Sequence, residues 1–285
     1  LIDYQRFRIS NNADPFDFDT FYHDRCRLNS TGDILCVPWM THRVLCSVKL
    51  TNWPYDVQEC SLEYASWSLQ TVNYKMNFSS PAISIVGAEY GAEWFISDYK
   101  QVENISGTQL KIILVLEREA VGLAAVMIYP AVILSALSLM CLFLDVRRQV
   151  RLSVSCFSLL SQYYFLSELG QNLPKESAFP PTILLYYRGS VILTVLIILF
   201  TFFLAAICKL RSTPHYYVKS VNDFVYESYG VYLVFPRWDF DDSKPFSEDW
   251  TKFGNVVNST FVFIIIIAYI SLYGSLMPKP GTVKY

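Results

Sequence analysis

The sequence predicts a partial all-β sandwich followed by an all-α domain of four membrane-spanning helices. Residues 1–118 consist of short alternating runs broken by turn residues, a pattern typical of strands. Beyond residue 119 the chain contains long uncharged stretches. A hydrophobic content of 53% beside 17% charged residues fits a protein that is part aqueous and part membrane.

Two segments of the first part show the alternation of half-buried strands, Val44–Leu50 and Leu110–Arg118. A third segment, Cys26–Cys36, is symmetric about Thr31, with Asn, Ser, Gly and Asp clustered at its centre as in a hairpin turn. Opposed cysteines on such a hairpin lie near the Cα separation of about 5.5 Å that a disulfide favours. The alternative is that both cysteines are buried and unpaired.

The helical spans are predicted from charge-free stretches. Ala120–Leu144 would rise ~37 Å as a helix, enough to cross a hydrocarbon core of about 30 Å. Ser190–Cys208 and, approximately, Phe261–Met277 form the third and fourth spans, and both approach the roughly 20 residues that a crossing needs. The second span, Val150–Gly170, is rich in serine and must therefore face protein or water instead of lipid.

Basic residues give the orientation of these spans. They gather in the connections that follow the first and third spans: Arg147, Arg148, Arg151, Lys209, Arg211 and Lys219. The positive-inside rule places both connections in the cytoplasm and both termini outside. The expected domains are an extracellular β-sandwich over 1–118, spans one to three over 119–208, a cytoplasmic loop with an amphipathic helix over 209–254, and the fourth span with an extracellular tail over 255–285.

Several classes of function find little support in the composition. A net charge of -2 offers no basic surface for nucleic acid, and the three histidines lack metal-ligand spacing. No Ser/His/Asp or Cys/His arrangement recurs, so neither an enzyme nor a bound cofactor is expected. The polar start, Leu1–Asp14, lacks the pattern of a signal peptide, and we interpret it as a truncated or processed end.

Cysteines and sequons of the first part indicate an oxidising, extracellular environment. Four of the seven cysteines lie in this polar part, where disulfides are expected. The same part carries three glycosylation sequons, at Asn29, Asn77 and Asn104.

The segment from Cys46 to Cys60 carries the most specific motif. Thirteen residues separate the two cysteines, and Trp-Pro-Tyr-Asp-x-Gln precedes the second. With four spans following it, this segment resembles the signature loop of the Cys-loop receptors, which are pentameric ligand-gated ion channels. The Asp-x-Gln spelling and Trp67 favour the nicotinic acetylcholine receptor branch. The resemblance implies a disulfide between Cys46 and Cys60.

The resemblance covers nearly the whole chain but includes departures. Asn11–Asp14 resembles the end of the family's first agonist-binding loop, and Pro130 the proline of its first span. The vicinal cysteine pair of α-type subunits is missing from Tyr99–Gln109, and Asp3–Arg6 stands in place of a Trp-x-Pro-Asp motif. The chain also begins late relative to the family. We therefore expect a divergent, non-α subunit that is short at its N-terminus.

The resemblance also assigns ligand and coupling residues. Trp67 would belong to the aromatic cage that holds ammonium ligands by cation–π attraction, with Tyr99 as its partner. The alternative is that Trp67 lies in the core of the sandwich. Pro54, Asp56 and Arg118 would lie near the membrane surface, where a charge pair couples the ligand domain to the pore. Arg118 could instead simply anchor a span at the interface.

The second span is predicted to line a water-filled pore. Residues at spacings of three and four share one face of this helix: Arg148, Arg151, Ser155, Ser158, Gln162, Phe165 and Leu169. An ungapped match puts Arg148 at the family's acidic ring and Ser158 at its gate, although a shift would bring Leu159 or Leu160 to the gate. Arginines in a ring would repel cations. The alternative is a polar helix flank buried against neighbouring spans.

These features predict a subunit of an acetylcholine receptor-like channel that works in a heteropentamer with partners carrying an acidic ring. The expected partners are other receptor subunits, an acetylcholine-like neurotransmitter at subunit interfaces, and membrane lipid. The expected location is the plasma membrane, at synapses. A second candidate is a non-conducting accessory or regulatory subunit, which the short start and the incomplete cage favour.

We expect glycans on Asn29, Asn77 and Asn104 and none on Asn258, although Asn258-Ser-Thr is also a sequon. The reason is topology, because Asn258 falls at the cytoplasmic start of the fourth span. Mass spectrometry of peptides from the chain made in a eukaryotic host, with and without glycosidase, checks this. A glycan on Asn258 would overturn the predicted orientation.

Overall fold

The chain folds into two compact units, of which the first holds the strands and the second the helices. The structure is a computed structural model that describes residues 7–9, 11, 13, 26–37, 42–66, 77–78, 91, 93–103, 109–173, 180–210, 213–227, 229–238 and 247–279. The first unit comprises residues 1–49 and 55–119, and the second comprises residues 50–54 and 120–285. A β domain followed by a helical transmembrane domain is the fold class that the sequence predicts, and this prediction is confirmed.

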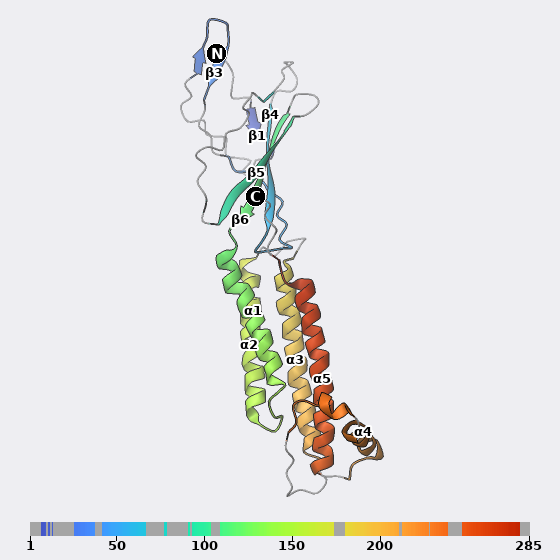
Figure 1. Cartoon of the computed structure of the whole chain (residues 1–285). Coiled ribbons are helices and arrows are strands. Elements are labelled where there is room, and N and C mark those ends of the chain that lie inside the picture. The colour runs from blue at the N-terminus through green and yellow to red at the C-terminus, as the bar shows by residue number, and fades with distance from the viewer. Residues whose placement is uncertain are drawn as a thin grey trace. The chain divides into compact units, whose positions relative to one another are not determined.

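A four-stranded antiparallel sheet forms the main layer described in the first unit (Figure 1). Its strand order is β1-β4-β6-β5, with β1 at Phe7–Ile9, β4 at Val57–Ser66, β5 at Trp94–Glu103 and β6 at Gln109–Arg118. The central strand β6 is rich in Ile, Leu and Val, which suit a half-buried pleated surface. Its predicted position, from Leu110 to Arg118, is confirmed.

A separate hairpin is built from β2 at Cys26–Leu28 and β3 at Ile34–Cys36. The register pairs Cys26 directly with Cys36, and a disulfide joins them with a Cα separation of 4.2 Å. Gly32 in the turn has a φ of 91°, a left-handed conformation that glycine adopts without steric cost. The predicted hairpin is therefore present.

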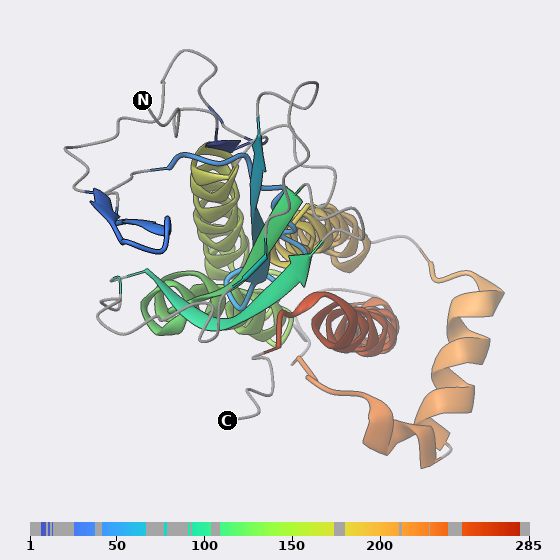
Figure 2. The same cartoon turned by 90° about the horizontal axis from the view of Figure 1, so that it is seen from above.

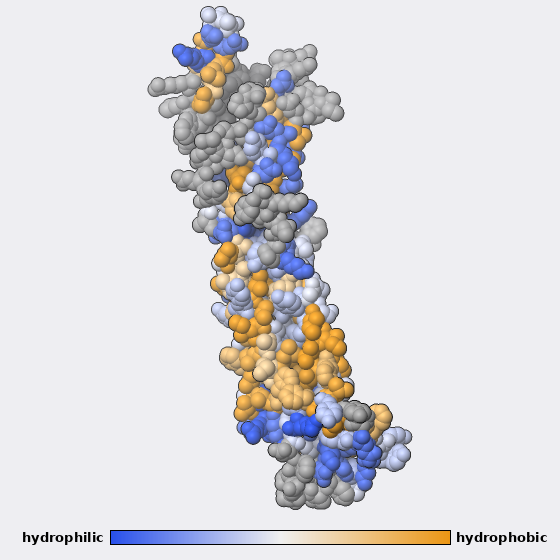
Figure 3. Space-filling model, viewed as in Figure 1, coloured by the Kyte–Doolittle hydropathy of each residue, from blue (hydrophilic) through white to orange (hydrophobic). Residues whose placement is uncertain are grey.

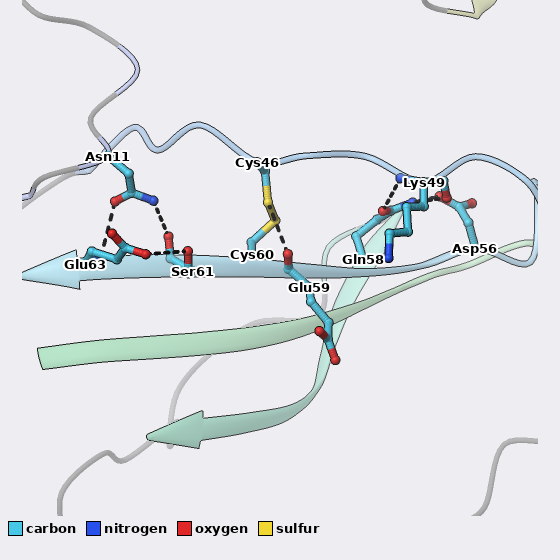
Figure 4. The surroundings of a disulfide bond; sticks show 9 residues. All are labelled: Asn11, Cys46, Lys49, Asp56, Gln58, Glu59, Cys60, Ser61 and Glu63. Carbon is cyan, nitrogen blue, oxygen red and sulfur yellow. Dashed lines mark hydrogen bonds between the residues drawn. A yellow bond between two sulfur atoms is a disulfide. The ribbon is translucent and has the colours of Figure 1, made fainter. Parts of the chain in front are cut away.

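The predicted strand over Val44–Leu50 is wrong. Only Val44 makes an isolated bridge, and the residues after it belong to no strand. The side chain of Gln58 takes the place of a neighbouring strand, because its Oε1 accepts from Lys49 N and its Nε2 donates to Lys49 O, both at 3.0 Å (Figure 4). An amide side chain carries the same donor and acceptor as a peptide group, so it satisfies the backbone of Lys49 without a ladder.

Four long helices form the bundle of the second unit (Figure 2). They are α1 at Val121–Cys141, α2 at Gln149–Asn172, α3 at Thr182–Cys208 and α5 at Ser247–Leu276. α3 packs against both α2 and α5, and α1 packs mainly against α2. Among the described residues, α1, α3 and α5 are long and apolar enough to cross a membrane, whereas α2 is too polar to qualify on composition.

Two helices extend beyond the predicted spans. α3 begins eight residues before Ser190, and α5 is one continuous helix of 30 residues that starts inside the segment 209–254, for which the sequence predicts a cytoplasmic loop. The connection between α3 and α5 also contains two unpredicted elements, α4 at Tyr216–Glu227 and the 3₁₀ helix η2 at Tyr229–Leu233. α4 lies beside α5 (Figures 1 and 2).

Side chains of α5 hold the segment that follows η2. Ser259 Oγ accepts from Phe235 N at 2.8 Å and donates to Phe235 O at 3.1 Å. Asn255 similarly contacts both the backbone N and the backbone O of Trp238, at 3.4 Å each. These contacts lie in the first half of α5, which explains why that helix starts long before its apolar run.

We expect non-reducing peptide mapping to recover two linked pairs, Cys26 with Cys36 and Cys46 with Cys60. The opposed positions of the first pair on one hairpin and of the second beside one strand make both bonds local. Alkylation before digestion should label only Cys141, Cys156 and Cys208, which are free thiols. Recovery of alkylated Cys26 or Cys36 from folded protein would contradict the hairpin register.

Candidate functional site

The signature loop is closed by a disulfide between Cys46 and Cys60, whose Cα atoms lie 5.3 Å apart. Cys60 lies on β4, and this strand includes the last four residues of the loop, from Val57 to Cys60 (Figure 4). Asn11 holds the same strand from the other side of the disulfide, because its Nδ2 donates to Ser61 O at 2.6 Å and its Oδ1 accepts from Glu63 N at 3.3 Å. The loop therefore starts and ends on one fixed part of the sheet.

Asp56 is the electrostatic centre of this loop. It is only 3% exposed, and it accepts from Arg118 Nε at 2.8 Å and Arg118 Nη2 at 3.4 Å. Gln58 Nε2 also donates to Asp56 Oδ2, at 2.6 Å. The guanidinium of Arg118 in turn lies 4.0 Å from the ring centre of Trp94, within cation–π range. The loop and the end of the last strand are thus joined by a buried ion pair.

The tip of the same loop is part of the helical unit. Leu50 and Trp53 are buried in an apolar cluster with residues of α1, α2 and α3. The backbone N of Thr182, at the start of α3, donates to Thr51 O at 3.0 Å. Pro54 is also buried. A single disulfide-closed loop therefore contributes residues to both compact units.

The polar stripe of α2 faces the interior of the bundle. Arg151, Ser155, Ser158 and Gln162 are each 1% exposed or less. A side chain that lines a channel must be open in the single subunit, because its partner there is water. In the single subunit these four residues are therefore arranged as in the alternative, a polar flank buried against neighbouring spans, and their burial does not support the prediction that they line the pore.

Two other predicted pore residues differ from these four. Arg148 precedes α2 and is exposed. Phe165 is half-buried and stacks on Tyr187 of α3, with ring centres 6.0 Å apart. Leu160, considered for the gate, is 69% exposed on the opposite side of α2, whereas Leu159 is half-buried.

Hydrogen bonds explain why the stripe turns inward. Gln162 Nε2 donates to Ser138 Oγ at 3.0 Å, and Thr194 Oγ1 donates to Gln162 Oε1 at 3.0 Å. The hydroxyls of Ser138 and Ser158 lie 2.7 Å apart. Tyr269 OH lies 3.5 Å from Thr194 Oγ1 and extends the network to α5. Side chains from all four long helices thus satisfy one another.

Of the two residues predicted for the agonist cage, the described part of the chain contains only Tyr99. Trp67 and Asn104 lie outside the described residues. Tyr99 is half-buried on β5, where its backbone N donates to Asp98 Oδ1 at 2.8 Å. The sequon asparagines Asn29 and Asn77 are exposed. Among the described residues, no cluster of His, Cys, Asp or Glu could hold a metal ion.

Sequence reasoning missed the partners of the α2 stripe on other helices. Ser190, Thr194 and Thr201 are polar positions four and seven residues apart in an apolar span, and this spacing was the available signal. Asn258 and Trp238, which lie at the end of the bundle near Arg151, carried no comparable signal.

Comparisons with known proteins agree with this arrangement. A sequence model of the neurotransmitter-gated ion-channel ligand binding domain matches residues 7–120. The chain is 26% identical to acetylcholine receptor subunit beta-type unc-29 of Caenorhabditis elegans, over 68% of the chain and 39% of that protein. It is 22% identical to neuronal acetylcholine receptor subunit beta-2 of Carassius auratus, over 80% of the chain and 51% of that protein. It is 24% identical to neuronal acetylcholine receptor subunit alpha-2 of Gallus gallus, over 83% of the chain and 45% of that protein.

A β domain with a disulfide-closed loop, followed by helices long and apolar enough to cross a membrane, is the arrangement expected from the resemblance to the Cys-loop receptors. Residues 7–120 match the ligand-binding domain of neurotransmitter-gated ion channels, and the chain is similar to acetylcholine receptor subunits. It spans about half or less of the length of the curated relatives it matches.

We expect Arg118→Gln to destabilise the first unit by about 3 kcal/mol, because it leaves the carboxylate of Asp56 buried without its charged partner. Lys100→Gln is the matched control, since Lys100 pairs with Glu59 in the same sheet but both side chains are mostly exposed. The control should cost less than about 1 kcal/mol. Thermal unfolding of the purified chain in detergent measures both, and equal shifts in the two variants would contradict the buried-pair interpretation.

Proposed function

We propose that the chain is a subunit of an acetylcholine receptor-like, neurotransmitter-gated pentameric ion channel. The observation that carries this proposal is that the signature loop, Cys46–Cys60, contributes residues to both compact units. Its Asp56 is paired with Arg118 in the sheet unit, while its Leu50 and Trp53 are buried among the helices. A loop with residues in both units can transmit a change in the ligand domain to the helices.

The proposed orientation places the sheet unit and both termini outside the plasma membrane. Arg147 and Arg148 lie in the α1–α2 connection, and Lys209 follows α3 directly. α1 runs toward this end of the bundle and α2 runs away from it, so all three basic residues share one end (Figure 1). An apolar surface band covers the helices, and hydrophilic atoms gather near α4 (Figure 3). This distribution supports a cytoplasmic location for that end.

We assign the pore-facing side of α2 to its exposed residues. Ser153, Phe157, Leu160 and Tyr164 recur at spacings of four, three and four, and all are exposed. Because Ser155, Ser158 and Gln162 are buried and hydrogen-bonded inside the subunit, this outer face is the side left for water or for neighbouring subunits. Leu160, at mid-helix, is the gate residue that this assignment favours.

The charge proposed for the inner mouth now rests on Arg148. Arg151 is enclosed by the bundle, whereas Arg148 is exposed just before α2 begins. One arginine per subunit at this position would lower the local concentration of cations. Partner subunits with acidic residues at the same level would offset it, so we retain a heteropentamer as the working assembly.

A second candidate is a non-conducting accessory subunit. The observation that favours it is the bulk of the exposed face of α2, which presents Phe157, Leu160, Tyr163 and Tyr164. Large apolar and aromatic side chains at a constriction expel water, and this opposes conduction. In this case the acetylcholine-like ligand would bind between partner subunits, and the chain would tune assembly.

We expect Leu160→Cys, in a Cys156→Ala background and co-expressed with nicotinic partner subunits, to make agonist-evoked current sensitive to a charged, water-soluble thiol reagent. The reason is that Leu160 lies on the exposed side of α2, while the control position Gln162 is enclosed. Gln162→Cys in the same background should stay insensitive, and the background alone provides the baseline.

The other outcomes separate the candidates. If neither cysteine reacts while surface assembly changes, the accessory candidate replaces the channel subunit. If Gln162→Cys reacts and Leu160→Cys does not, the buried stripe faces the pore in the assembly, and the assignment of the exposed face is incorrect.

A further inference from the structure

A buried arginine lies at the end of the bundle where α1 stops and α2 begins. Arg151, in the first turn of α2, is 0% exposed. An arginine keeps its proton in proteins, so this side chain carries a positive charge wherever it is placed. Burying a charge costs several kcal/mol unless the charge is paired and hydrogen-bonded. Its partners therefore decide how the site is stabilised.

The described partners of Arg151 are all neutral. Its Nε donates to Thr201 Oγ1 at 3.1 Å, and its Nη1 donates to Leu144 O and to Asn258 Oδ1 at 3.2 Å each. Within the part of the chain that the structure describes, no carboxylate forms an ion pair with it. Asp145, the nearest acidic residue in sequence, instead pairs with Arg147 at 2.9 Å.

Two buried hydrogen-bond donors in this region, Arg151 Nη2 and Trp238 Nε1, have no acceptor among the described residues. Their side chains are neighbours, since the Arg151 guanidinium carbon lies over the Trp238 ring, 5.8 Å from its centre. A buried donor without an acceptor costs about 1–3 kcal/mol, so two such donors on neighbouring side chains indicate a missing acceptor.

The surroundings favour a negative acceptor. Arg151 lies in the first turn of α2, where backbone N–H groups and the helix dipole add positive potential. Arg147 and Arg148 precede it. Burial alone would raise the pKa of Asp145, but hydrogen bonds from Arg147 and the charges of Arg147 and Arg148 hold this pKa below its ordinary value. Asp145 is thus charged, but it pairs with Arg147 and not with Arg151.

We propose that Arg151 and Trp238 bind a small monovalent anion of the halide type, such as chloride, inside the helical bundle of each subunit. The ion accepts from Arg151 Nη2 and Trp238 Nε1 and neutralises the guanidinium. It links α2 to the segment after η2, which Asn255 and Ser259 hold against α5. The site lies within one chain and does not depend on which face of α2 lines a pore.

The class of anion follows from burial and charge. Trp238 is 8% exposed and Arg151 not at all, so a phosphate group attached to a lipid would have to open the bundle to reach them. One unpaired guanidinium matches one negative charge, whereas a phosphate dianion would leave an excess. Two donors also suit a small spherical ion, because the neutral acceptors already occupy Nε and Nη1.

The test is thermal unfolding of the full chain in detergent, in sodium chloride and in sodium gluconate at equal ionic strength. Chloride should raise the unfolding midpoint, with an effect that grows and then levels as chloride is titrated. At 100 times its dissociation constant, chloride lowers the unfolding equilibrium constant about 100-fold. Arg151→Gln should abolish this dependence, and Arg148→Gln, with the same change of charge on an exposed residue, should keep it.

Iodide quenching of tryptophan fluorescence provides a second readout that does not require Arg151→Gln to fold. Iodide should quench the tryptophan fluorescence of the wild-type chain more than that of Trp238→Phe. Added chloride should reduce this difference in quenching, because it competes with iodide for the site. A wild-type chain with no chloride dependence, or equal quenching of wild type and Trp238→Phe, would overturn the proposal.

A carboxylate of the chain itself is the other candidate for the place of the anion, because Asp239, Asp241 and Asp242 follow Trp238 in the sequence. Replacing all three by Asn distinguishes it from a free anion. Chloride dependence that appears only in this triple variant would show that a carboxylate of the chain occupies the place, and the anion proposal would fail. If the unfolding midpoint depends on chloride equally in the wild type and in the triple variant, the result supports a free anion.

Discussion

Hydrogen bonding among polar side chains inside the helical bundle is the constraint on which the rest of the structure depends. Lipid offers no partners to a polar group, so a helix as polar as α2 needs neighbours that supply them. Ser138 on α1 and Thr194 on α3 do so for Gln162. Such bonds contribute only about 0.6 kcal/mol each on average in membranes, but leaving their groups unpaired would cost more.

This network sets the rotation of α2, and the rotation decides which side chains the subunit presents. Once Ser155, Ser158 and Gln162 are enclosed, the aromatic and aliphatic residues between them, such as Phe157 and Leu160, must point outward. A helix has a single orientation about its axis, so satisfying one face exposes the other. The proposed function of α2 therefore follows from contacts that lie wholly within one subunit.

The signature loop combines two kinds of interaction that differ in range. The disulfide joins two residues that are 14 positions apart, and the amide of Gln58 holds the backbone of Lys49, nine positions away. The pair of Asp56 with Arg118 connects it across 62 residues to the end of β6. Arg118 is the last residue of β6, and Glu119 and Ala120 separate it from the start of α1, so the ion pair ties the loop to the end of that strand.

The sequence by itself determined the two-part fold and the polar character of α2, which depend on local patterns such as a run without charges. It also predicted both cysteine pairs, Cys26–Cys36 from its local symmetry, with unpaired cysteines as the alternative, and Cys46–Cys60 from the resemblance to the Cys-loop receptors. Only the tertiary structure decided where the polar stripe of α2 points. A helical period defines a face but not its partner, and water in a pore or hydroxyls on neighbouring helices would satisfy Gln162 equally well. The partners, Ser138 and Thr194, lie 24 and 32 residues away in the chain, so only folding brings them together.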